Sequence, residues 1–549
     1  MMEKYSNHYI QEIPLSSPFF HGKVERFLRA NGLRMEELDS YYTIENADGD
    51  IIAGAGLRKD VVKCIAVAPE ARSEGLTAPL VSHIAAVVAG RGITCLKVFT
   101  KLENTAVFES LGFRVLASAP QAVLMENGRG LEQYCAYLRS LKRPGTAGVV
   151  VMNANPFTLG HRYLLEQALK RVDTVYVIPV KEDVSCFPYA SRKAMIEAGA
   201  PEGVIVAEGS DYQISEATFP TYFLKDLSDA APNQMRLDLD LFARHIAPAL
   251  GADIRFVGSE PADALTARYN RLMKEVLPIE VVEIPRLCGP ARRNEAVSAS
   301  AVRAFLDAGD YASASALVPA TSRPHLLARL ATRALLKELD TPLKPGLVGP
   351  DSNGAHADMD YALMRKAISA LYPFWSRMAS ARSAEELRQL GLEAEKAMLS
   401  ATGGVNTHRG AIYALGLALY DPCHMADTAK ALPREGVKER PGVCGAREMA
   451  EGGYRMLFED WLPYYRATGD CGKTLLRILS TLDDTCVIKR VGPQRAQEVR
   501  REAEEVLRST DNFTGKLKEL CSRYAAEGIS PGGSADMLAL TIFIDSIKD

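Results

Sequence analysis

Residues that could bind a phosphate stand close together in the segment Asn153-Ala-Asn-Pro-Phe-Thr-Leu-Gly-His161. Thr158 and His161 are three residues apart, so at the start of a helix both side chains can donate hydrogen bonds to the same phosphate. Asn155 adds an amide to this loop, and Gly160 leaves room for a nucleotide to approach the backbone. The pattern predicts a nucleotide site, with an ordinary capped helix as the alternative for so short a motif.

A second polar motif, Val297-Ser-Ala-Ser-Ala-Val-Arg303, lies further along the chain and follows the basic pair Arg292-Arg293. Ser298 and Ser300 offer hydroxyl groups, and Arg303 offers a forked cation that suits polyphosphate. The alternative is that the serines cap a helix and the arginine is solvated. The presence of both motifs in one region favours an ATP site over that alternative.

Five polar clusters in the last part of the chain suggest a second site. They are Lys344 between two prolines; His356, Asp358 and Asp360; Asn406, His408 and Arg409; Asp483 and Asp484; and Ser534 in the segment Ser530–Asp536. Carboxylates beside histidine and lysine are typical of Mg²⁺-nucleotide binding with an acid or base nearby. Each cluster alone could be a capped helix or a loop, but five are excessive for a plain helical core, where buried charge is costly.

An alternation of strands and helices must position the first group of residues. Apolar runs typical of buried strands cover residues 148–152, 174–180, 203–209, 253–258 and 280–285, and helical patterns cover 160–170, 191–199 and 264–276. This alternation predicts an α/β domain over residues 143–325, with a doubly wound, Rossmann-like parallel sheet. Ligands bind at the carboxyl ends of such strands, where helix N-termini point their N–H groups at phosphate.

The flanking regions have different patterns. Residues 1–142 contain runs typical of strands at 41–46, 51–57, 63–69 and 95–100 and a helical pattern at 76–92, which predicts a small α+β domain. Strand signals almost vanish over residues 326–549, which predicts an all-α domain. Three domains agree with the length of 549 residues.

The composition is that of a globular protein, with 47% hydrophobic residues, 24% charged residues and a net charge of −3. No global basic field would attract nucleic acid or an anionic membrane, so neither is an expected partner. No apolar stretch approaches the roughly 20 residues of a membrane span, and the N-terminus does not have the pattern of a secretory signal. The ten cysteines form no C-x-x-C pair, which predicts reduced thiols in the cytoplasm.

The two phosphate motifs resemble the T/H-x-G-H and I-S-x-S-x-x-R signatures of the nucleotidyltransferase superfamily. Residues 147–310 are more specifically similar to the ligase that acetylates citrate lyase. The similarity covers nearly the whole middle domain and includes Ser185-Cys-Phe-Pro-Tyr189 with Arg192, the segment Gly209–Lys225, and Gly258-Ser-Glu-Pro261 leading to Tyr269-Asn270.

This resemblance implies an ATP-dependent reaction of acetate with a carrier protein. Acetate would attack the α-phosphate of ATP to give acetyl-adenylate and pyrophosphate, and the thiol of the carrier's prosthetic group would then take the acetyl group. His161 and Thr158 are expected at the α-phosphate. Arg303 and Ser298 are expected at the departing pyrophosphate, with Mg²⁺ bridging the phosphates. Further basic candidates are Arg192 and Lys225.

A third motif, Val67-Ala-Pro-Glu-Ala-Arg-Ser-Glu-Gly75, follows a predicted strand and opens a helix, so its backbone N–H groups could cradle a pyrophosphate. Through Arg72 and Gly75 it resembles the R/Q-x-x-G-x-G/A loop of the GNAT acetyltransferases, with Thr77 at the third loop position. Asn104–Phe113 resembles a later helix and strand of that family. The resemblance implies a module that holds a pantetheine arm, and a purely structural appendage is the alternative.

The C-terminal region closely resembles triphosphoribosyl-dephospho-CoA synthase. The resemblance implies that the ribose 2′-hydroxyl of dephospho-CoA attacks C1′ of the ATP ribose and expels adenine, and that carboxylates favour an oxocarbenium-like transition state. Asp358, Asp360 and Asp484 are expected near the ribose or the metal, the first two as metal ligands. The residues expected on the phosphates are Lys344, Asn406, His408, Arg409 and Ser534.

The C-terminal region departs from that family at a few positions. Arg409 replaces the usual lysine after Thr-His and keeps the positive charge. Cys486 replaces the asparagine of Asp-Thr-Asn, and Val491 replaces the first glycine of Arg-Gly-Gly. The loss of a polar contact at these positions could weaken this activity.

Together these resemblances imply a bifunctional enzyme that matures citrate lyase. Its expected partners are acetate, dephospho-CoA and the citrate lyase acyl carrier protein, with ATP as substrate and Mg²⁺ as cofactor. One alternative is a pantetheine-phosphate-type adenylyltransferase, which would release pyrophosphate without acetate. Another is a non-catalytic scaffold for the carrier protein, which would bind ATP without turnover.

Overall fold

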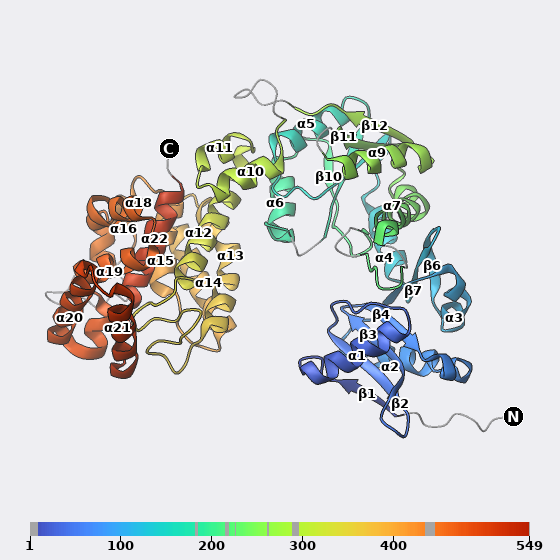
Figure 1. The fold of residues 1–549 in the computed structure, drawn as a ribbon. Helices are drawn as coiled ribbons and strands as arrows, with labels where there is room; N and C mark the ends of the chain where they lie inside the picture. Colours follow the sequence, from blue (N-terminus) through green and yellow to red (C-terminus); the bar gives the residue numbers. More distant parts are fainter. Residues whose placement is uncertain are drawn as a thin grey trace. The chain divides into compact units, whose positions relative to one another are not determined.

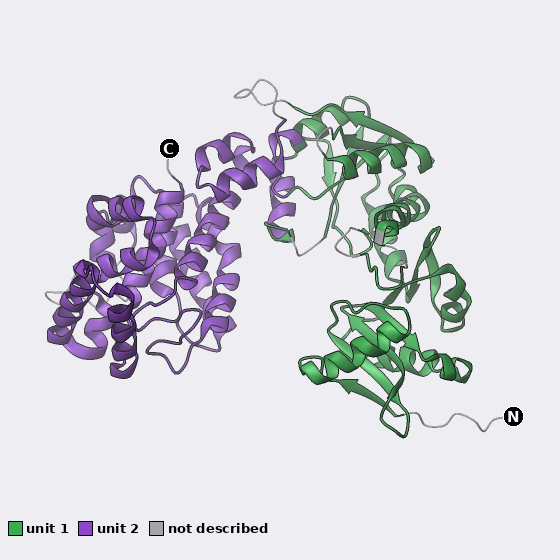
Figure 2. Ribbon diagram, in the orientation of Figure 1, with its two compact units in different colours: residues 1–154, 161–189, 200–287 green, residues 155–160, 190–199, 288–549 purple. Residues whose placement is uncertain are grey.

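The computed structural model describes residues 9–181, 185–214, 219–224, 227–260, 263–287, 296–433 and 445–547. The chain divides into two compact units (Figure 2). Unit 1 comprises residues 1–154, 161–189 and 200–287, and unit 2 comprises residues 155–160, 190–199 and 288–549. Within the described ranges, every helix is too short or too polar to cross a membrane.

A seven-stranded mixed sheet forms the N-terminal part of unit 1 (Figure 1). Its order is β1-β2-β3-β4-β5-β7-β6, with β1 Ile10–Ile13, β2 Ser40–Glu45, β3 Ile51–Arg58, β4 Val61–Val67, β5 Leu96–Thr100, β6 Arg114–Ala119 and β7 Ala122–Asn127. The accompanying helices are α1 Pro18–Ala30, η1 Pro69–Glu74, α2 Thr77–Gly90, η2 Leu102–Asn104, α3 Thr105–Ser110 and α4 Gly130–Leu141. The α+β class predicted for this region is confirmed.

Two neighbouring strands of this sheet separate along their length. β4 and β5 run parallel, and in the described sheet they pair only through Val61 and Val62 at the start of β4. β4 continues to Val67 and β5 to Thr100, so the two strands diverge toward their carboxyl ends. The divergence opens the sheet beside η1, where the third sequence motif lies.

A five-stranded parallel sheet forms the rest of unit 1. Its order is β10-β9-β8-β11-β12, with β8 Ala147–Met152, β9 Thr174–Pro179, β10 Val204–Val206, β11 Ile254–Gly258 and β12 Glu280–Ile284. The helices here are α5 Leu159–Ala168, whose first two residues belong to unit 2, α7 Ala230–Leu241, η4 Phe242–Ile246, α8 Ala247–Leu250 and α9 Ala264–Val276. All four strand pairs are parallel, which confirms the predicted doubly wound sheet.

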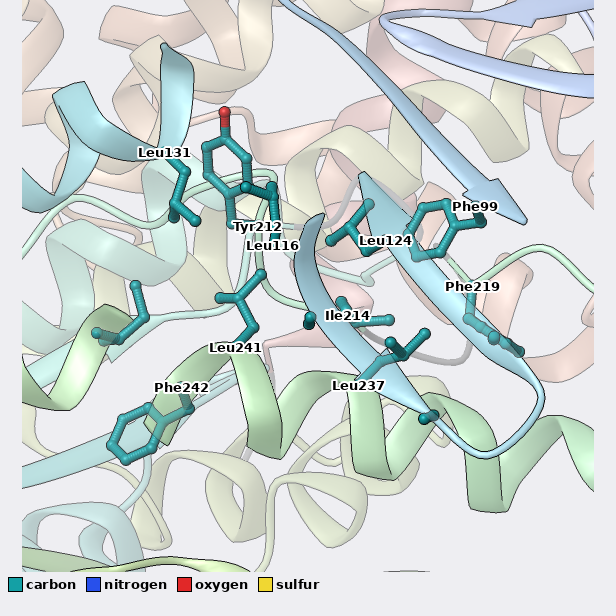
Figure 3. Close-up of a cluster of buried hydrophobic side chains, with 14 of the residues drawn as sticks. Phe99, Leu116, Leu124, Leu131, Tyr212, Ile214, Phe219, Leu237, Leu241 and Phe242 are labelled. Carbon is teal, nitrogen blue, oxygen red and sulfur yellow. The ribbon is translucent and has the colours of Figure 1, made fainter. Parts of the chain in front are cut away.

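One hydrophobic core joins the two sheets of unit 1 (Figure 3). Side chains from both parts contribute to it, among them Phe99, Leu116, Leu124, Ile214, Phe219, Leu237, Leu241 and Phe242. Beside this core the hydroxyl of Tyr212 donates a hydrogen bond to the buried carboxylate of Glu126. The N-terminal part is therefore packed into unit 1 through a shared interior.

The regular secondary structure in the described part of unit 2 is helical, apart from bridge positions at Ala296, Gly349 and Ser352. Its helices are α6 Tyr189–Gly199, whose first residue belongs to unit 1, α10 Ala299–Asp307, α11 Tyr311–Ala316, η5 Ala320–Ser322, α12 Arg323–Leu339, α13 Tyr361–Met378, α14 Ala384–Thr402, α15 Arg409–Tyr420, α16 Met425–Ala431, α17 Ala446–Glu451, η6 Leu457–Trp461, α18 Leu462–Thr468, α19 Cys471–Thr481, α20 Thr485–Arg508, α21 Phe513–Glu527 and α22 Gly532–Ser546. The all-α class predicted for the C-terminal region is confirmed.

Helix α22 forms the interior of unit 2. Every residue from Met537 to Ile544 is buried, and the helix packs against α12, α15, α18 and α19. A helix that is buried on all sides needs an apolar sequence around its whole circumference, which LALTIFI supplies. Of the polar residues at its start, Ser534 is consequently buried and Asp536 is half-buried.

Candidate functional sites

Residues 155–160 of the first phosphate motif contact the second motif within unit 2. Ser298 caps α10, since its Oγ accepts a hydrogen bond from the Ala301 N–H at 3.1 Å, and Ser300 Oγ lies 3.0 Å from it. Arg303 Nη1 donates a hydrogen bond to the backbone oxygen of Asn155 in the first motif. The arrangement places serine hydroxyls, a helix N-terminus and a guanidinium beside the loop that precedes α5, as a polyphosphate site requires.

Gly160 is fixed by packing against the second motif. A Cβ at this position would lie 2.9 Å from the carbonyl oxygen of Val297, which is closer than real Cβ contacts. The Leu159 N–H also donates a hydrogen bond to the Leu317 oxygen at 2.9 Å, and Thr158 is buried just before the helix. The glycine therefore lets the two motifs approach each other, in addition to its expected role of leaving room for a nucleotide.

His161, in the first turn of α5, lies in unit 1 beside a basic residue that was not predicted. Burial, together with the positive charge of Arg286, lowers the pKa of His161 to about 4, so the ring is neutral at neutral pH. Arg286 Nε donates a hydrogen bond to the Ser259 oxygen at 2.8 Å, and its guanidinium pairs with Glu260. Arg286 follows the last strand of the parallel sheet, and this position was its only signal in the sequence.

The remaining candidates of the middle region take different places. Ser185 Oγ donates a hydrogen bond to Asn153 Oδ1 at 3.2 Å, which links the Ser185–Tyr189 motif to the first phosphate loop. Arg192 is fully buried on α6. Three basic candidates lie outside the described residues: Lys225, Arg292 and Arg293.

Buried charges gather around Lys344 in unit 2. Lys344 is 5% exposed, and its Nζ donates to Glu338 Oε1 at 2.6 Å and to the Glu338 backbone oxygen at 2.8 Å. His408 is 3% exposed, and its Nε2 has no hydrogen-bond partner within the described part of the chain. Burial and the nearby Lys344 lower the pKa of His408 to about 4. A buried imidazole nitrogen without a partner is a natural contact for a ligand.

Two carboxyl groups extend this buried cluster. Asp484 caps α20 by accepting from the Cys486 N–H at 2.9 Å, and it also accepts from the Ser534 N–H at 2.7 Å and Oγ at 2.9 Å. Burial and the neighbouring carboxylates of Asp484 and Glu338 raise the pKa of Asp536 well above its usual value. The neutral, protonated form of Asp536 is therefore favoured relative to an exposed aspartate. Sequence analysis singled out neither Glu338 nor Asp536, because their burial arises from tertiary packing.

The other predicted residues of the second site are more exposed. Asp358 is exposed, and its Oδ1 lies 3.6 Å from His356 Nδ1. Asp360 caps α13 through the Leu363 N–H at 2.8 Å. Asn406 Oδ1 accepts from the Arg409 N–H at 3.3 Å, and the guanidinium of Arg409 pairs with Glu395. No group of three or more His, Cys, Asp or Glu among the described residues could hold a metal ion.

Two cavities border Asp484. The larger has a volume of about 240 Å³ and is lined by Val487, Gln497 and Arg500. The smaller has a volume of about 30 Å³ and is lined by Gly410, Tyr454 and Asp536. Both cavities are lined by Leu482, Asp483 and Asp484, so the carboxyl group of Asp484 borders a cavity on each side.

A third cavity occupies the opening between β4 and β5 in unit 1. It has a volume of about 390 Å³, and its apolar wall includes Ile65, Val67, Phe108, Tyr222 and Phe223. The polar residues that line it are Arg72, Thr77, Thr100, Lys101, Glu103, Asn104 and Asn31. Gly75, which follows η1, has a φ of 68°, a left-handed conformation that favours glycine. The GNAT-like loop therefore borders a real cavity.

Two protein families match successive parts of the chain, and they meet near residue 325, where the sequence patterns also predict a boundary. Residues 147–326 match the family model described as the citrate lyase ligase C-terminal domain. Residues 324–433 and 424–549 match the model described as ATP:dephospho-CoA triphosphoribosyl transferase. Each match contains one of the two groups of polar residues described above.

Individual relatives support the same division. A [citrate [pro-3S]-lyase] ligase of Klebsiella pneumoniae is 40% identical over 308 residues, which are 54% of this chain and 89% of that protein. The corresponding ligase of Escherichia coli (strain K12) is 38% identical over 317 residues, 55% of this chain and 89% of that protein. A probable 2-(5''-triphosphoribosyl)-3'-dephosphocoenzyme-A synthase of Pseudomonas putida is 37% identical over 261 residues, 40% of this chain and 93% of that protein. The chain therefore belongs to the citrate lyase ligase family in its first part and to the ATP:dephospho-CoA triphosphoribosyl transferase family in its second part.

Proposed function

We propose that this chain is a bifunctional enzyme that matures citrate lyase. Its first part acetylates the thiol of the prosthetic group on the citrate lyase acyl carrier protein, using ATP and acetate. Its second part makes the precursor of that prosthetic group, 2′-(5″-triphosphoribosyl)-3′-dephospho-CoA, from ATP and dephospho-CoA. The names of the relatives of each part support this pairing. The free cysteines of the described chain agree with a reducing compartment, so we place the enzyme in the cytoplasm.

The observation that carries the ligase assignment is the contact between the two phosphate motifs, in which Arg303 reaches the loop of Asn155. An oxygen of acetate forms a bond to the α-phosphorus of ATP, the bond to the bridging oxygen breaks, and pyrophosphate leaves. Thr158 and His161 bind the α-phosphate, and Ser298, Ser300 and Arg303 bind the pyrophosphate. The carrier thiolate then attacks the acetyl carbon and displaces AMP. This reaction needs positioning and charge neutralisation, and no protein nucleophile.

The buried cluster of unit 2 supports the second reaction. The 2′-hydroxyl oxygen of dephospho-CoA forms a bond to C1′ of the ATP ribose, and the bond from C1′ to adenine breaks. Adenine takes up a proton as it leaves, and Asp536, whose pKa is raised well above its usual value, is the proposed donor. A carboxylate of the cluster takes up the hydroxyl proton. Lys344, His408 and Arg409 are the proposed phosphate contacts.

Mg²⁺ is the proposed metal of both sites. Mg²⁺ is commonly held by one or two carboxylates, by water and by substrate phosphates, so a large cluster of protein ligands is not required. Asp358 and Asp360 are both exposed, so their carboxylates are accessible to a hydrated ion. Asp358 and Asp360 remain the proposed ligands in unit 2. When bound, the ion would neutralise the triphosphate.

A direct assay distinguishes this proposal from its alternatives. The purified chain is incubated with ATP and labelled pyrophosphate, with or without acetate, and separately with ATP and dephospho-CoA. We expect exchange of label into ATP only with acetate, and release of adenine only with dephospho-CoA. Pyrophosphate release with a pantetheine phosphate and no acetate would indicate an adenylyltransferase. ATP binding without either turnover would indicate a scaffold.

The cavity between β4 and β5 is the proposed binding place for a pantetheine arm. Its apolar wall suits the arm, and Arg72 at its edge suits a phosphate. We expect CoA to bind the chain in calorimetry and the Arg72→Ala variant to bind it at least tenfold more weakly. Equal binding by both proteins would contradict this placement and favour a structural role for the N-terminal part.

A further inference from the structure

The parallel sheet of unit 1 contains a buried arginine whose guanidinium lacks a full set of partners. Arg255, on β11, is 4% exposed, and its Nε has no hydrogen-bond partner in the described structure. The guanidinium carbon lies 4.4 Å from the centre of the Phe242 ring. A buried charge of this kind is costly unless something pairs with it.

The acidic group that attracts this arginine electrostatically, Asp238, already accepts hydrogen bonds from other residues. Asp238 attracts Arg255 electrostatically, but its described hydrogen bonds come from the Tyr269 hydroxyl and, at 3.0 Å, from the Ile214 N–H. Asp238 therefore offsets part of the positive charge of Arg255 but does not accept hydrogen bonds from all of its N–H groups. Arg255 retains donor capacity for a second anion.

A small cavity adjoins this guanidinium. Its volume is about 20 Å³, and it is lined by Arg255 together with both apolar and polar residues. The apolar wall comes from Val151, Ile178, Leu241, Phe242 and Ile246, and the polar wall from Tyr134, Ser210, Tyr212, Gln213 and Asp238. Three of the lining residues, Tyr212, Leu241 and Phe242, are labelled in Figure 3. Ser210, Tyr212 and Gln213 belong to the ligase-like segment Gly209–Lys225, which the ATP site leaves without a role.

Part of the cavity wall lies near the start of the first phosphate loop, within unit 1. Val151 lines it and precedes Asn153, where the first phosphate loop begins, by two residues. Two residues of a strand span roughly 7 Å, so the cavity opens near the carboxyl end of β8. Ligands of doubly wound sheets bind at this edge.

We propose that this cavity is the carboxylate subsite of the ligase, which selects the acid to be activated. The proposal rests on the proposed ligase function and adds to it the residues that bind the acid. The forked donors of Arg255 match a carboxylate, and the apolar wall receives a methyl group. The cavity is small, with a volume of about 20 Å³, so the shortest acids are favoured over longer ones. Each further methylene would have to displace the apolar wall.

The first test replaces Arg255 by lysine, which keeps the charge and loses the fork. Acetate-dependent exchange of pyrophosphate into ATP is measured with the full chain. We expect the KM for acetate to rise at least tenfold and the KM for ATP to stay within twofold. Arg236→Lys, the same change at an exposed position of α7, is the matched control and should leave both values unchanged.

The second test replaces Val151 by alanine, a mild change that enlarges the cavity. We expect the ratio of kcat/KM for propionate to that for acetate to rise about tenfold, since one methylene in a fitted pocket changes discrimination by at least this factor. Thermal melting verifies that each variant is folded. If Arg255→Lys does not fold, the selectivity of Val151→Ala decides alone.

The outcomes distinguish a failure of the proposed ligase function from a failure of the proposed carboxylate subsite. A wild-type chain without acetate-dependent exchange would overturn the proposed ligase function itself. An active wild type, with an unchanged acetate KM in folded Arg255→Lys or an unchanged acid preference in Val151→Ala, would overturn the carboxylate subsite and leave the ligase function standing.

Discussion

His408 and Asp536 lie in the same buried cluster of unit 2, and burial moves both groups toward their neutral forms. The pKa of His408 falls to about 4, while the pKa of Asp536 rises well above its usual value. The two shifts have opposite sign because burial disfavours the charged form, which is the protonated imidazole in one case and the ionised carboxyl in the other. At neutral pH the His408 imidazole is therefore neutral, and it lies in the same cluster as the Lys344–Glu338 pair and an Asp536 carboxyl group whose pKa is raised.

This burial makes the stability of the chain depend on pH. An unfolded histidine titrates near 6.5, so between about pH 6.5 and pH 4 the unfolded state binds a proton at His408 that the folded state does not. Stability is therefore full above pH 6.5 and falls on acidification. Lowering the pH from 7 to 5 should cost on the order of 2 kcal/mol from this residue alone.

Melting temperatures at pH 7 and pH 5 measure this effect. The difference between the two temperatures should be smaller in His408→Gln than in the wild type, because the variant has no imidazole to protonate. His21→Gln, at an exposed position of α1, is the control and should show the wild-type difference. An identical acid sensitivity in His408→Gln and the wild type would contradict a buried, neutral His408.

At the scale of elements, the position of α10 depends on the absence of a side chain at Gly160. Its Cα faces the carbonyl of Val297, just before the helix whose N-terminus presents Ser298 and Ser300. A methyl group there must push the second phosphate motif away from the first. The geometry of the proposed ATP site is thus set by backbone packing as well as by the polar side chains.

Gly160→Ala should therefore reduce acetate-dependent pyrophosphate exchange by at least a hundredfold while the chain stays folded, because small misplacements of catalytic groups have large effects on rate. Gly391→Ala is a matched control, since a Cβ at Gly391 in α14 meets open space and alanine favours a helix. Exchange at the wild-type rate in Gly160→Ala would show that the contact with Val297 is unimportant.

Strongly patterned elements could be predicted from the sequence. The expected strands at 148–152, 174–180 and 253–258 correspond to β8, β9 and β11 within two residues, because buried parallel strands are continuous apolar runs. Helix α7 was not predicted, because its sequence AAPNQMRLDLDL alternates apolar and charged residues without a clear helical stripe. Its burial comes from contact with β6 and β7, which are distant in sequence.

The candidate sites show the same difference. Thr158, Ser298 and Arg303 could be predicted because they belong to short motifs, and the structure brings the loop of the first motif to the arginine of the second. Arg255 and Asp536 could not be assigned a role from sequence, since each acquires its chemistry by burial among residues far along the chain. Tertiary desolvation has no local sequence signal.

At the scale of the whole molecule, the two sheets of unit 1 share one hydrophobic core, whereas the helices of unit 2 have a core of their own. The N-terminal sheet and the parallel sheet of unit 1 share one core, which includes Phe99 and Leu124 from one side and Leu237 and Leu241 from the other. The helical region has its own buried centre in α22. The predicted boundary near residue 142 therefore crosses an apolar interior, and the boundary near residue 326 falls inside α12 and within unit 2.

Truncation should reveal this difference. A chain lacking residues 1–142 should aggregate or lose pyrophosphate exchange, because it exposes the shared core to water. Residues 326–549 alone should remain folded and release adenine. Circular dichroism, size-exclusion chromatography and the two activity assays provide the measurement. A fully active ligase without residues 1–142 would contradict the structural role of the shared core.

Two variants of the full chain, each assayed for both reactions, test the presence of two separate ATP-using sites. His161→Ala should abolish acetate-dependent pyrophosphate exchange and leave adenine release from ATP and dephospho-CoA unchanged. Asp536→Asn, which removes the proposed proton donor but keeps its shape, should reduce adenine release at least a hundredfold and leave the exchange unchanged. If either variant remained folded and lost both reactions, the two activities would share a site and the account would be wrong.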